Sequence, residues 1–128
     1  MKIVYLSGTW DLFHYGHLKM IKRAWKLGAL VIGVNTKAYC KSIGKKPYFS
    51  FSNRKTIIEA LRYTDKVCSH TNGTYLPDWV DIRVVGSDWG KTKEQKEALL
   101  IMKKKGIKVI VYPRTKGVST TKIEKELR

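Results

Sequence analysis

The sequence predicts an α/β fold built on a parallel sheet of five strands, with helices on both faces. Three observations predict it. Short apolar runs rich in β-branched and aromatic residues recur along the chain, as expected of buried strands. Stretches with apolar residues at helical spacing separate these runs, and such alternation is typical of parallel sheets. The length of 128 residues and the hydrophobic fraction of 43% suit one core, so we expect a single domain over residues 1–128.

The first half of the chain predicts two strands and two helices. Strands are expected at residues 3–8 and 29–35, because both are short apolar runs. The helix between them is basic and amphipathic, and Gly28 fits its C-cap. Its apolar residues recur at helical spacing: Leu18, Ile21, Trp25 and, less regularly, Leu27. Residues 36–51 have no period and are expected to form a long loop, which in a compact domain is usually functional.

The second half repeats the alternation. A helix capped by Ser52 or Asn53 is expected to turn Ile57, Ile58 and Leu61 inward. A second amphipathic helix, with Ala98, Leu99 and Met102 as its apolar stripe, is expected to end at Gly106. The remaining elements follow in order: a strand at 65–69, a loop or single turn at 71–79, a strand at 82–86, the helix at 93–104, a strand at 107–112 and a helix at 119–127.

The charge pattern points to anionic ligands. The chain carries 26 basic and 10 acidic residues, a formal charge of +16, and no Asp or Glu lies between Leu12 and Ile58. So basic a chain binds polyanions or small phosphorylated anions. The basic residues form neither one tail nor one helix face, and no zinc-finger, KH or RRM signature is present. We therefore expect no specific nucleic-acid partner.

The lack of a recognisable targeting signal and the two isolated cysteines predict a cytoplasmic protein. No stretch approaches the roughly 20 apolar residues of a membrane span, and the chain starts directly with a strand rather than a signal peptide. Cys40 and Cys68 are isolated, and we expect them to be reduced packing residues. These observations predict no membrane partner.

The candidate functional residues concentrate at residues 8–17, between the first strand and the first helix. His14 and His17 lie at the helix start, where unpaired backbone N–H groups and the helix dipole suit an anion. Gly8 and Gly16 let the backbone approach a ligand. Taken alone, such histidines are often hydrogen-bonded surface residues. No Cys or carboxylate completes a four-ligand pattern around them, so no protein-held metal is expected.

Ligands of a Rossmann-like parallel sheet bind at the carboxyl ends of its strands. Three separated pairs follow predicted strands and should therefore meet at one edge: Gly8-Thr9, Gly86-Ser87 and Pro113-Arg114. The sequence thus predicts one site built from distant motifs.

Two motifs carry a resemblance to a known family. The run Gly-Thr-Trp-Asp-Leu-Phe-His-Tyr-Gly-His at residues 8–17 resembles the signature of the nucleotidylyltransferase superfamily. The run Pro-Arg-Thr-Lys-Gly-Val-Ser-Thr-Thr-Lys-Ile at residues 113–123 is similar to the C-terminal signature of its cytidylyltransferase branch, glycerol-phosphate-type members above all. The likeness extends over nearly the whole chain: it includes Asn53-Arg54-Lys55, Arg62-Tyr63-Thr64-Asp65 and Gly86-Ser87-Asp88-Trp89.

The resemblance implies transfer of CMP from CTP to a phosphorylated alcohol, glycerol 3-phosphate above all. The products would be CDP-glycerol, used in teichoic acid or other cell-surface polymer synthesis, and pyrophosphate. It also implies Mg2+ carried by the triphosphate and a homodimer. The residues it assigns are catalytic His14, His17, Lys45 and Arg114; nucleotide-binding Gly8, Thr9, Trp10, Asp11, Gly16, Lys46, Asp88, Thr115, Ser119 and Thr120; and acceptor-binding Arg54 and Arg62.

Several of these residues also have ordinary structural explanations. Asp11 could be a cap or turn former, and the two loop lysines could serve solubility. Thr121 with Glu124 fits a capping box at the start of the last helix. Arg54 and Arg62 could stabilise a subunit contact instead of clamping the acceptor phosphate.

Three departures from the family pattern question the acceptor more than the reaction. Trp10 replaces the usual Phe, Lys37 stands where an acidic residue is common, and Ile43 replaces the first lysine of the loop pair. Two other functions stay open: an adenylyltransferase acting on a sugar phosphate or flavin precursor, and a nucleic-acid-binding protein on the same fold. The pair Arg114-Thr115 favours CTP over ATP.

Overall fold

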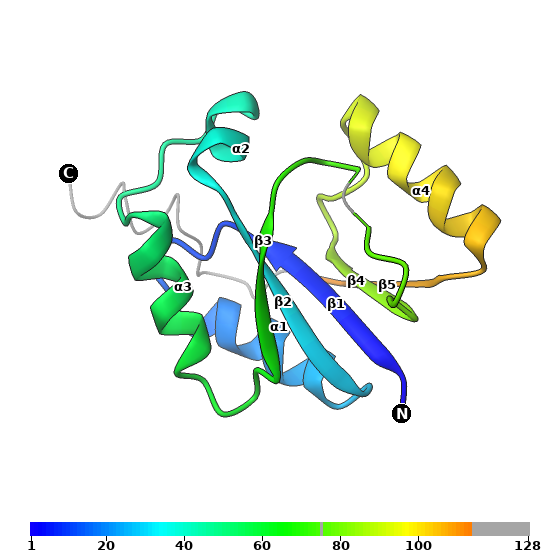
Figure 1. Ribbon diagram of the computed structural model, residues 1–128, viewed down its shortest axis with the longest axis horizontal. Coiled ribbons are helices and arrows are strands. Elements are labelled where there is room, and N and C mark those ends of the chain that lie inside the picture. Colours follow the sequence, from blue (N-terminus) through cyan, green and yellow to red (C-terminus); the bar gives the residue numbers. More distant parts are fainter. Residues whose placement is uncertain (75, 114–128) are drawn as a thin grey trace.

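The computed structural model describes residues 1–74 and 76–113, which contain a five-stranded sheet with the strand order β3-β2-β1-β4-β5 (Figure 1). Every neighbouring pair is parallel. The elements are β1 Ile3–Gly8, α1 Tyr15–Trp25, β2 Ala29–Asn35, α2 Lys37–Ser42, α3 Phe51–Glu59, β3 Lys66–His70, β4 Ile82–Gly86, α4 Lys93–Lys105 and β5 Lys108–Tyr112. The predicted Rossmann-like α/β fold is confirmed.

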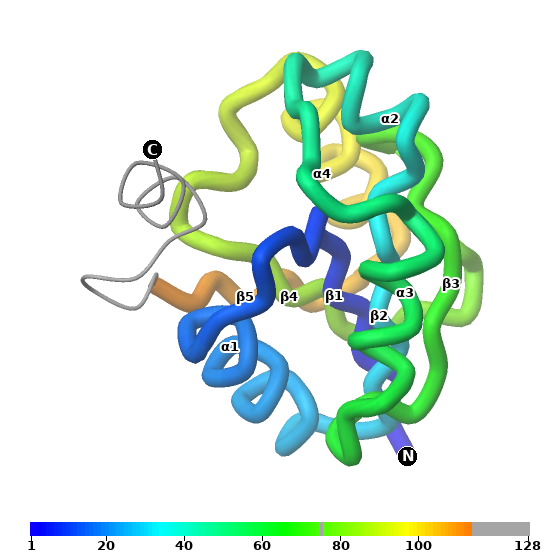
Figure 2. The backbone as a smooth tube through the Cα atoms, turned by 90° about the vertical axis from the view of Figure 1, so that its left-hand side faces the viewer, coloured from blue at the N-terminus to red at the C-terminus, as the bar shows by residue number. Residues whose placement is uncertain are grey.

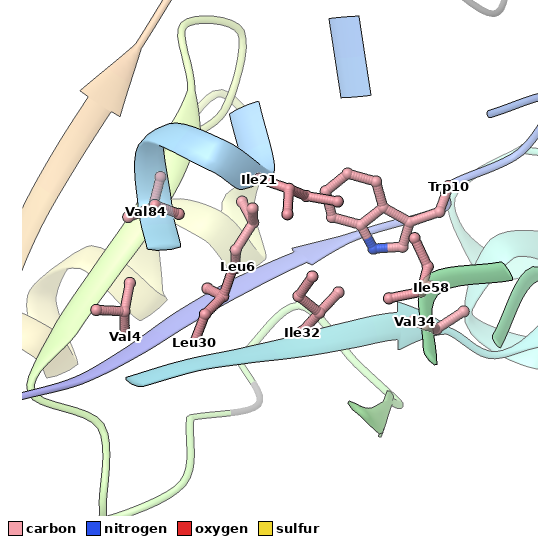
Figure 3. Packing of buried hydrophobic residues seen from close by; sticks show 10 residues of the cluster. Val4, Leu6, Trp10, Ile21, Leu30, Ile32, Val34, Ile58 and Val84 are labelled. Carbon is pink, nitrogen blue, oxygen red and sulfur yellow. The ribbon is translucent and has the colours of Figure 1, made fainter. Parts of the chain in front are cut away.

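Helices α1 and α3 lie on one side of the sheet and α4 lies on the other (Figures 1 and 2). The main core fills the α1/α3 side (Figure 3). Its fully or nearly fully buried side chains are Val4, Leu6, Trp10, Ile21, Ala24, Leu30, Ile32, Val34, Ile58 and Val84. A smaller cluster around Tyr5, Val31 and Val80 lies on the other face. Because both faces are covered, β1 and β2 carry continuous runs of buried residues rather than an alternating pattern.

The structure corrects the predicted loop at residues 36–51. Residues Lys37–Ser42 form α2, whose N-cap Thr36 accepts a hydrogen bond from the backbone N–H of Tyr39 at 3.2 Å. A helix of six residues is too short to show a hydrophobic period. Helix α3 also starts earlier than predicted, at Phe51, because the side chain of Ser50 caps it instead of Ser52 or Asn53.

The ends of the other helices follow local chemistry. Gly106 ends α4 with φ 72°, as predicted, because glycine enters the left-handed region without a Cβ penalty. The C-cap of α1 is Lys26 rather than Gly28, which follows two residues later. The helix predicted at residues 119–127 lies outside the described residues. In the part of the chain that is described, no helix is long and apolar enough to cross a membrane.

Candidate active site

The carboxyl ends of β1, β2 and β4 open into a cavity of about 1020 Å³. Its lining includes Gly8, Thr9, Trp10, Asp11, His14, Gly16, His17, Lys45, Lys46 and Asp88, all of which the sequence assigned to the site. Cationic side chains from two segments line it: Lys19 and Arg23 of α1 join Lys45 and Lys46 of the α2–α3 loop. The carboxylates in the lining are Asp11 and Asp88. This balance of charge suits an anionic ligand.

The β1–α1 loop has an unusual backbone. Trp10 and Leu12 have φ of 57° and 46°, a region that side chains other than glycine rarely adopt. Each such residue costs roughly 1–3 kcal/mol and persists only where its surroundings hold it. Burial of the Trp10 indole, 5% exposed, and its Nε1–H bond to the carbonyl of Gly33 at 3.0 Å hold the loop. Trp10 is therefore part of the core as well as of the cavity wall.

Gly8 allows this close packing. A Cβ at position 8 would lie 3.0 Å from Cε2 of the Trp10 indole, a tighter contact than most, so the indole would have to shift by a few tenths of an ångström. The glycine that sequence analysis assigned to the ligand thus also serves the packing of its neighbour. The edge of the Trp10 indole meets the ring of His17, with 5.5 Å between the ring centroids. Trp10, a core residue, therefore packs directly against His17, a catalytic candidate.

His14 and His17 form a reciprocal cap at the start of α1. Nδ1 of His14 accepts from the backbone N–H of Gly16 at 3.0 Å and of His17 at 3.4 Å, while Nδ1 of His17 accepts from the N–H of His14 at 3.2 Å. The two rings stack, with centroids 3.8 Å apart. Both side chains are thus fixed by the backbone before any ligand enters.

These bonds decide where the imidazole protons lie. Because each Nδ1 accepts a hydrogen bond, each neutral ring carries its hydrogen on Nε2, which makes Nε2 a donor. Protonation of His14 at Nδ1 would break two bonds. Burial also lowers the pKa of His14. The site therefore offers Nε2–H donors at the positive end of a helix, which is an anion-binding arrangement.

Asp11 holds the loop between α2 and α3. Its carboxylate is 3% exposed and accepts from the backbone N–H of Tyr48 at 2.8 Å and of Phe49 at 3.0 Å. Lys45 and Lys46 lie on this loop, exposed at the cavity. The structure thus gives Asp11 a positioning role, which differs from the nucleotide contact expected from the sequence.

Arg54 differs more from expectation. It is fully buried, and its guanidinium donates to the carbonyl oxygens of Thr9 and Asn35, both at 2.8 Å, and of Phe49 at 3.1 Å. These bonds join the end of β1, the end of β2 and the loop before α3, which is a structural role. The expected contact of Arg54 with the acceptor phosphate stays a prediction.

Arg62 is also away from the cavity. Its guanidinium stacks over the ring of Tyr63 at 5.1 Å, beside Lys22 and Trp25, and bonds the Tyr63 hydroxyl. This exposed cluster lies before β3, whereas the cavity lies at the carboxyl ends of the strands. The structure therefore does not bring Arg62 to the expected acceptor site. Arg114, Thr115, Ser119 and Thr120 lie outside the described residues.

Sequence reasoning missed several cavity residues on the far side of the sheet. They are Ser7, Asn35, Tyr39, His70 and Gln95, and they lie with Trp89 of the Gly86-Ser87-Asp88-Trp89 run that the sequence had singled out. Asn35 is 6% exposed, and its Oδ1 has no hydrogen-bond partner in the described part of the chain, so it can accept from a ligand. Of the missed residues, only Ser7 and Asn35 had a signal in the sequence, because each lies at the end of a predicted strand. Among residues 1–74 and 76–113, no cluster of three or more His, Cys, Asp or Glu side chains could hold a metal ion.

Comparison with known proteins places this arrangement in a family. Residues 5–126 match the family model described as cytidylyltransferase-like. The chain is 37% identical to the glycerol-3-phosphate cytidylyltransferase of Bacillus subtilis (strain 168), covering 99% of this chain and 98% of that protein. It is 35% identical to the protein of the same name from Staphylococcus aureus, covering 99% and 96%. A crystal structure of a lipopolysaccharide core biosynthesis protein from Thermoplasma volcanium superposes with a TM-score of 0.68 at 28% identity, covering 92% and 99%.

Proposed function

This chain belongs to the cytidylyltransferase-like family, and from that premise we propose that it transfers CMP from CTP to glycerol 3-phosphate, giving CDP-glycerol and pyrophosphate. The resemblance seen in the two sequence motifs is thereby confirmed. The observation that carries the proposal is the pair of stacked histidines, fixed by the backbone at a helix start inside a cavity lined with cations. The full-length likeness to glycerol-3-phosphate cytidylyltransferases supports glycerol 3-phosphate as the acceptor.

The reaction is one displacement at phosphorus. A phosphate oxygen of the acceptor attacks the α-phosphorus of CTP and forms the new P–O bond. The bond from that phosphorus to the oxygen bridging to the β-phosphate breaks, and pyrophosphate leaves with the electron pair. A phosphomonoester has a second pKa of about 6, so the nucleophile is already an anion at neutral pH. No general base is required.

The enzyme's task is therefore to bring two anions together and to stabilise the charge that develops. The Nε2–H groups of His14 and His17 are suited to this, because their rings need no reorganisation during the reaction. Lys45 and Lys46, on the loop held by Asp11, offset the repulsion between the triphosphate and the acceptor. Lys19 of α1, which the sequence did not assign, adds to the same field.

We propose that Mg2+ enters with the triphosphate. Mg2+ usually keeps several waters and few protein carboxylates when it binds phosphates. The donor set of the cavity fits that mode: both carboxylate oxygens of Asp11 already accept backbone bonds, and Asp88 is exposed at the opposite wall. When bound, the ion would neutralise phosphate charge. Asp88, exposed in the lining, would be the side chain to hold one of its waters.

Three finer features remain proposals. We propose a homodimer, a cytoplasmic location and use of the CDP-glycerol in cell-surface polymers such as teichoic acid. They rest on the family resemblance of the sequence. Size-exclusion chromatography with light scattering tests the first, and the acceptor screen described next bears on the last.

The test is a matrix of nucleotides and acceptors with the purified chain. Pyrophosphate release and product mass are measured for CTP, ATP, GTP and UTP, each with glycerol 3-phosphate, a sugar phosphate and riboflavin phosphate. We expect CDP-glycerol from CTP and glycerol 3-phosphate far in excess of other products. Equal use of CTP and ATP would refute the assignment and favour the adenylyltransferase alternative. Tight duplex DNA binding near physiological salt, with no pyrophosphate released, would favour the nucleic-acid-binding alternative.

A further inference from the structure

The cavity continues past the end of β1 onto the α4 side of the sheet. We call this part the far compartment; it is lined by Ser7, Asn35, Tyr39, His70, Trp89 and Gln95. The histidine pair and the loop lysines lie on the other side. Behind two of these lining residues, Ser7 and Trp89, lies a buried cation, Arg83 of β4, that neither the motifs nor the charge pattern predicted.

Arg83 is 3% exposed and lies beside Tyr5 in the sheet. Its guanidinium donates to the carbonyl of Val84 at 2.7 Å and to Oγ of Ser7 at 2.6 Å. It also covers the rings of Tyr5 and Trp89, with 5.1 and 5.4 Å between Cζ and the ring centroids. No carboxylate pairs with it within the described ranges. A buried cation without a counter-ion is costly, which is a reason to look for its use.

The charge of Arg83 reaches the far compartment. Ser7 and Trp89 contact the guanidinium and also line the cavity. Burial lowers the pKa of Arg83 to about 10, so it remains a cation at neutral pH. Burial, helped by the positive charge of Arg83, lowers the pKa of His70 to about 3, so His70 is neutral there. Burial, and after it the charge of Glu94 at the start of α4, raises the pKa of Tyr39, and this exposed Glu94 forms no pair with Arg83.

We propose that Arg83 is a specificity-determining residue that excludes acceptors bearing an ammonium group. Given the cytidylyl transfer proposed above, on which this inference rests, it restricts the reaction to phosphorylated alcohols whose remaining part is uncharged. A cationic acceptor entering the far compartment meets a like charge in surroundings of low dielectric. Such exclusion is a repulsive device, distinct from the attraction that binds the phosphate.

The aromatic rings reinforce the exclusion. Proteins that bind ammonium ligands place them over the faces of Trp or Tyr rings. Here the guanidinium of Arg83 already covers a face of Tyr5 and of Trp89. Ser7 completes the preference, because its Oγ accepts from Arg83 and its own hydrogen is directed elsewhere, available to a ligand hydroxyl. The compartment thus favours a hydroxyl over an ammonium group.

A matched pair of acceptors tests this in the wild-type protein. Ethanolamine phosphate and 2-hydroxyethyl phosphate differ only in an ammonium group against a hydroxyl, and glycerol 3-phosphate serves as reference. We expect kcat/KM with CTP to favour the hydroxyl compound by at least about tenfold. A ratio near one, with glycerol 3-phosphate turned over, overturns the role of Arg83 and leaves the proposed function intact. No CMP transfer to any of the three overturns the proposed function itself.

Variants identify the source of the ratio. Arg83→Met should reduce the ratio of kcat/KM between the hydroxyl and the ammonium acceptor at least about fivefold, mainly through KM for the ammonium acceptor. Arg83→Lys should retain most of the ratio. In both variants KM for CTP should change little. Lys103→Met, which removes one exposed charge from the end of α4, is the control and should leave the ratio unchanged. An unchanged ratio in an Arg83→Met protein that melts like wild type overturns the inference.

A second variant guards against loss of fold. Ser7→Asp keeps Arg83 and places a carboxylate where Oγ of Ser7 now accepts its hydrogen bond. Neutralising the guanidinium in this way should lower the ratio as Arg83→Met does. If Arg83→Met does not fold, a Ser7→Asp protein with the wild-type ratio overturns the inference, and a lowered ratio supports it.

Discussion

Replacing the Asp11 carboxylate tests whether one buried side chain shapes the cavity. Asp11→Asn keeps the volume but removes the charge. The amide can offer one oxygen to the N–H groups of Tyr48 and Phe49, and its NH2 group then faces the other donor. A hydrogen bond to a charged group is worth roughly 1.5–3 kcal/mol, so we expect the free energy of unfolding to fall by about 3 kcal/mol. For a chain of this size, the melting temperature should fall by about 10 °C.

The same substitution should impair nucleotide binding, because Lys45 and Lys46 lie on the loop that Asp11 holds. We expect KM for CTP to rise by at least about tenfold, with a smaller loss in kcat. Urea unfolding gives the stability, and steady-state pyrophosphate release gives the kinetics. Asp78→Asn is the control: Asp78 pairs with Lys105 on the surface at 3.0 Å, so its loss should cost about 1 kcal/mol or less.

Two results would refute this reasoning in different ways. Wild-type stability with lost turnover would return Asp11 to direct contact with the nucleotide or its metal. Lost stability with an unchanged KM for CTP would show that the loop lysines need no anchor at this residue. Asp11→Ala should be at least as damaging as Asp11→Asn, since it also leaves a cavity.

Three further outcomes follow from the same structure. His17→Ala should lower kcat by at least about a hundredfold with the fold intact, as measured by single-turnover kinetics and circular dichroism; near-normal turnover would remove His17 from the mechanism. CTP affinity should fall steeply between low and physiological salt, because the acid-free span from Leu12 to Ile58 attracts anions through a field that salt screens; a flat titration would contradict this. His70 has a folded pKa of about 3, below its unfolded value, so its contribution to stability is complete above pH 6.5 and is lost as the pH falls toward 3. Urea titrations at pH 7 and pH 5 measure how far the free energy of unfolding falls between them. This fall should be about 2 kcal/mol smaller in His70→Asn than in wild type, and equal falls would refute the assignment.

The sequence by itself determined the succession of strands and longer helices along the chain and the place of the main motif. Both follow from local chemistry: apolar runs of strand length, helical spacing, and capping residues such as Gly106. The motif at residues 8–17 was readable because its histidines and glycines lie within ten consecutive positions at one strand–helix junction. The net charge likewise predicted an anionic ligand before any contact was known. Helix α2 escaped detection because six residues carry no measurable period.

Only the tertiary structure decided what Asp11, Arg54 and Arg83 do. Each acts on partners far away in sequence: Asp11 bonds the backbone 37 and 38 positions on, Arg54 reaches Thr9 across 45 positions, and Arg83 reaches Ser7 across 76. Such pairs meet because the strand order β3-β2-β1-β4-β5 sets β2 and β4 on either side of β1. Hydrophobic periodicity does not encode that order. A buried arginine and a surface arginine look alike in a sequence. Burial, which only the folded chain sets, makes Arg54 a structural link between strands and loop and makes Arg83 a charge behind the Ser7 and Trp89 side chains of the cavity.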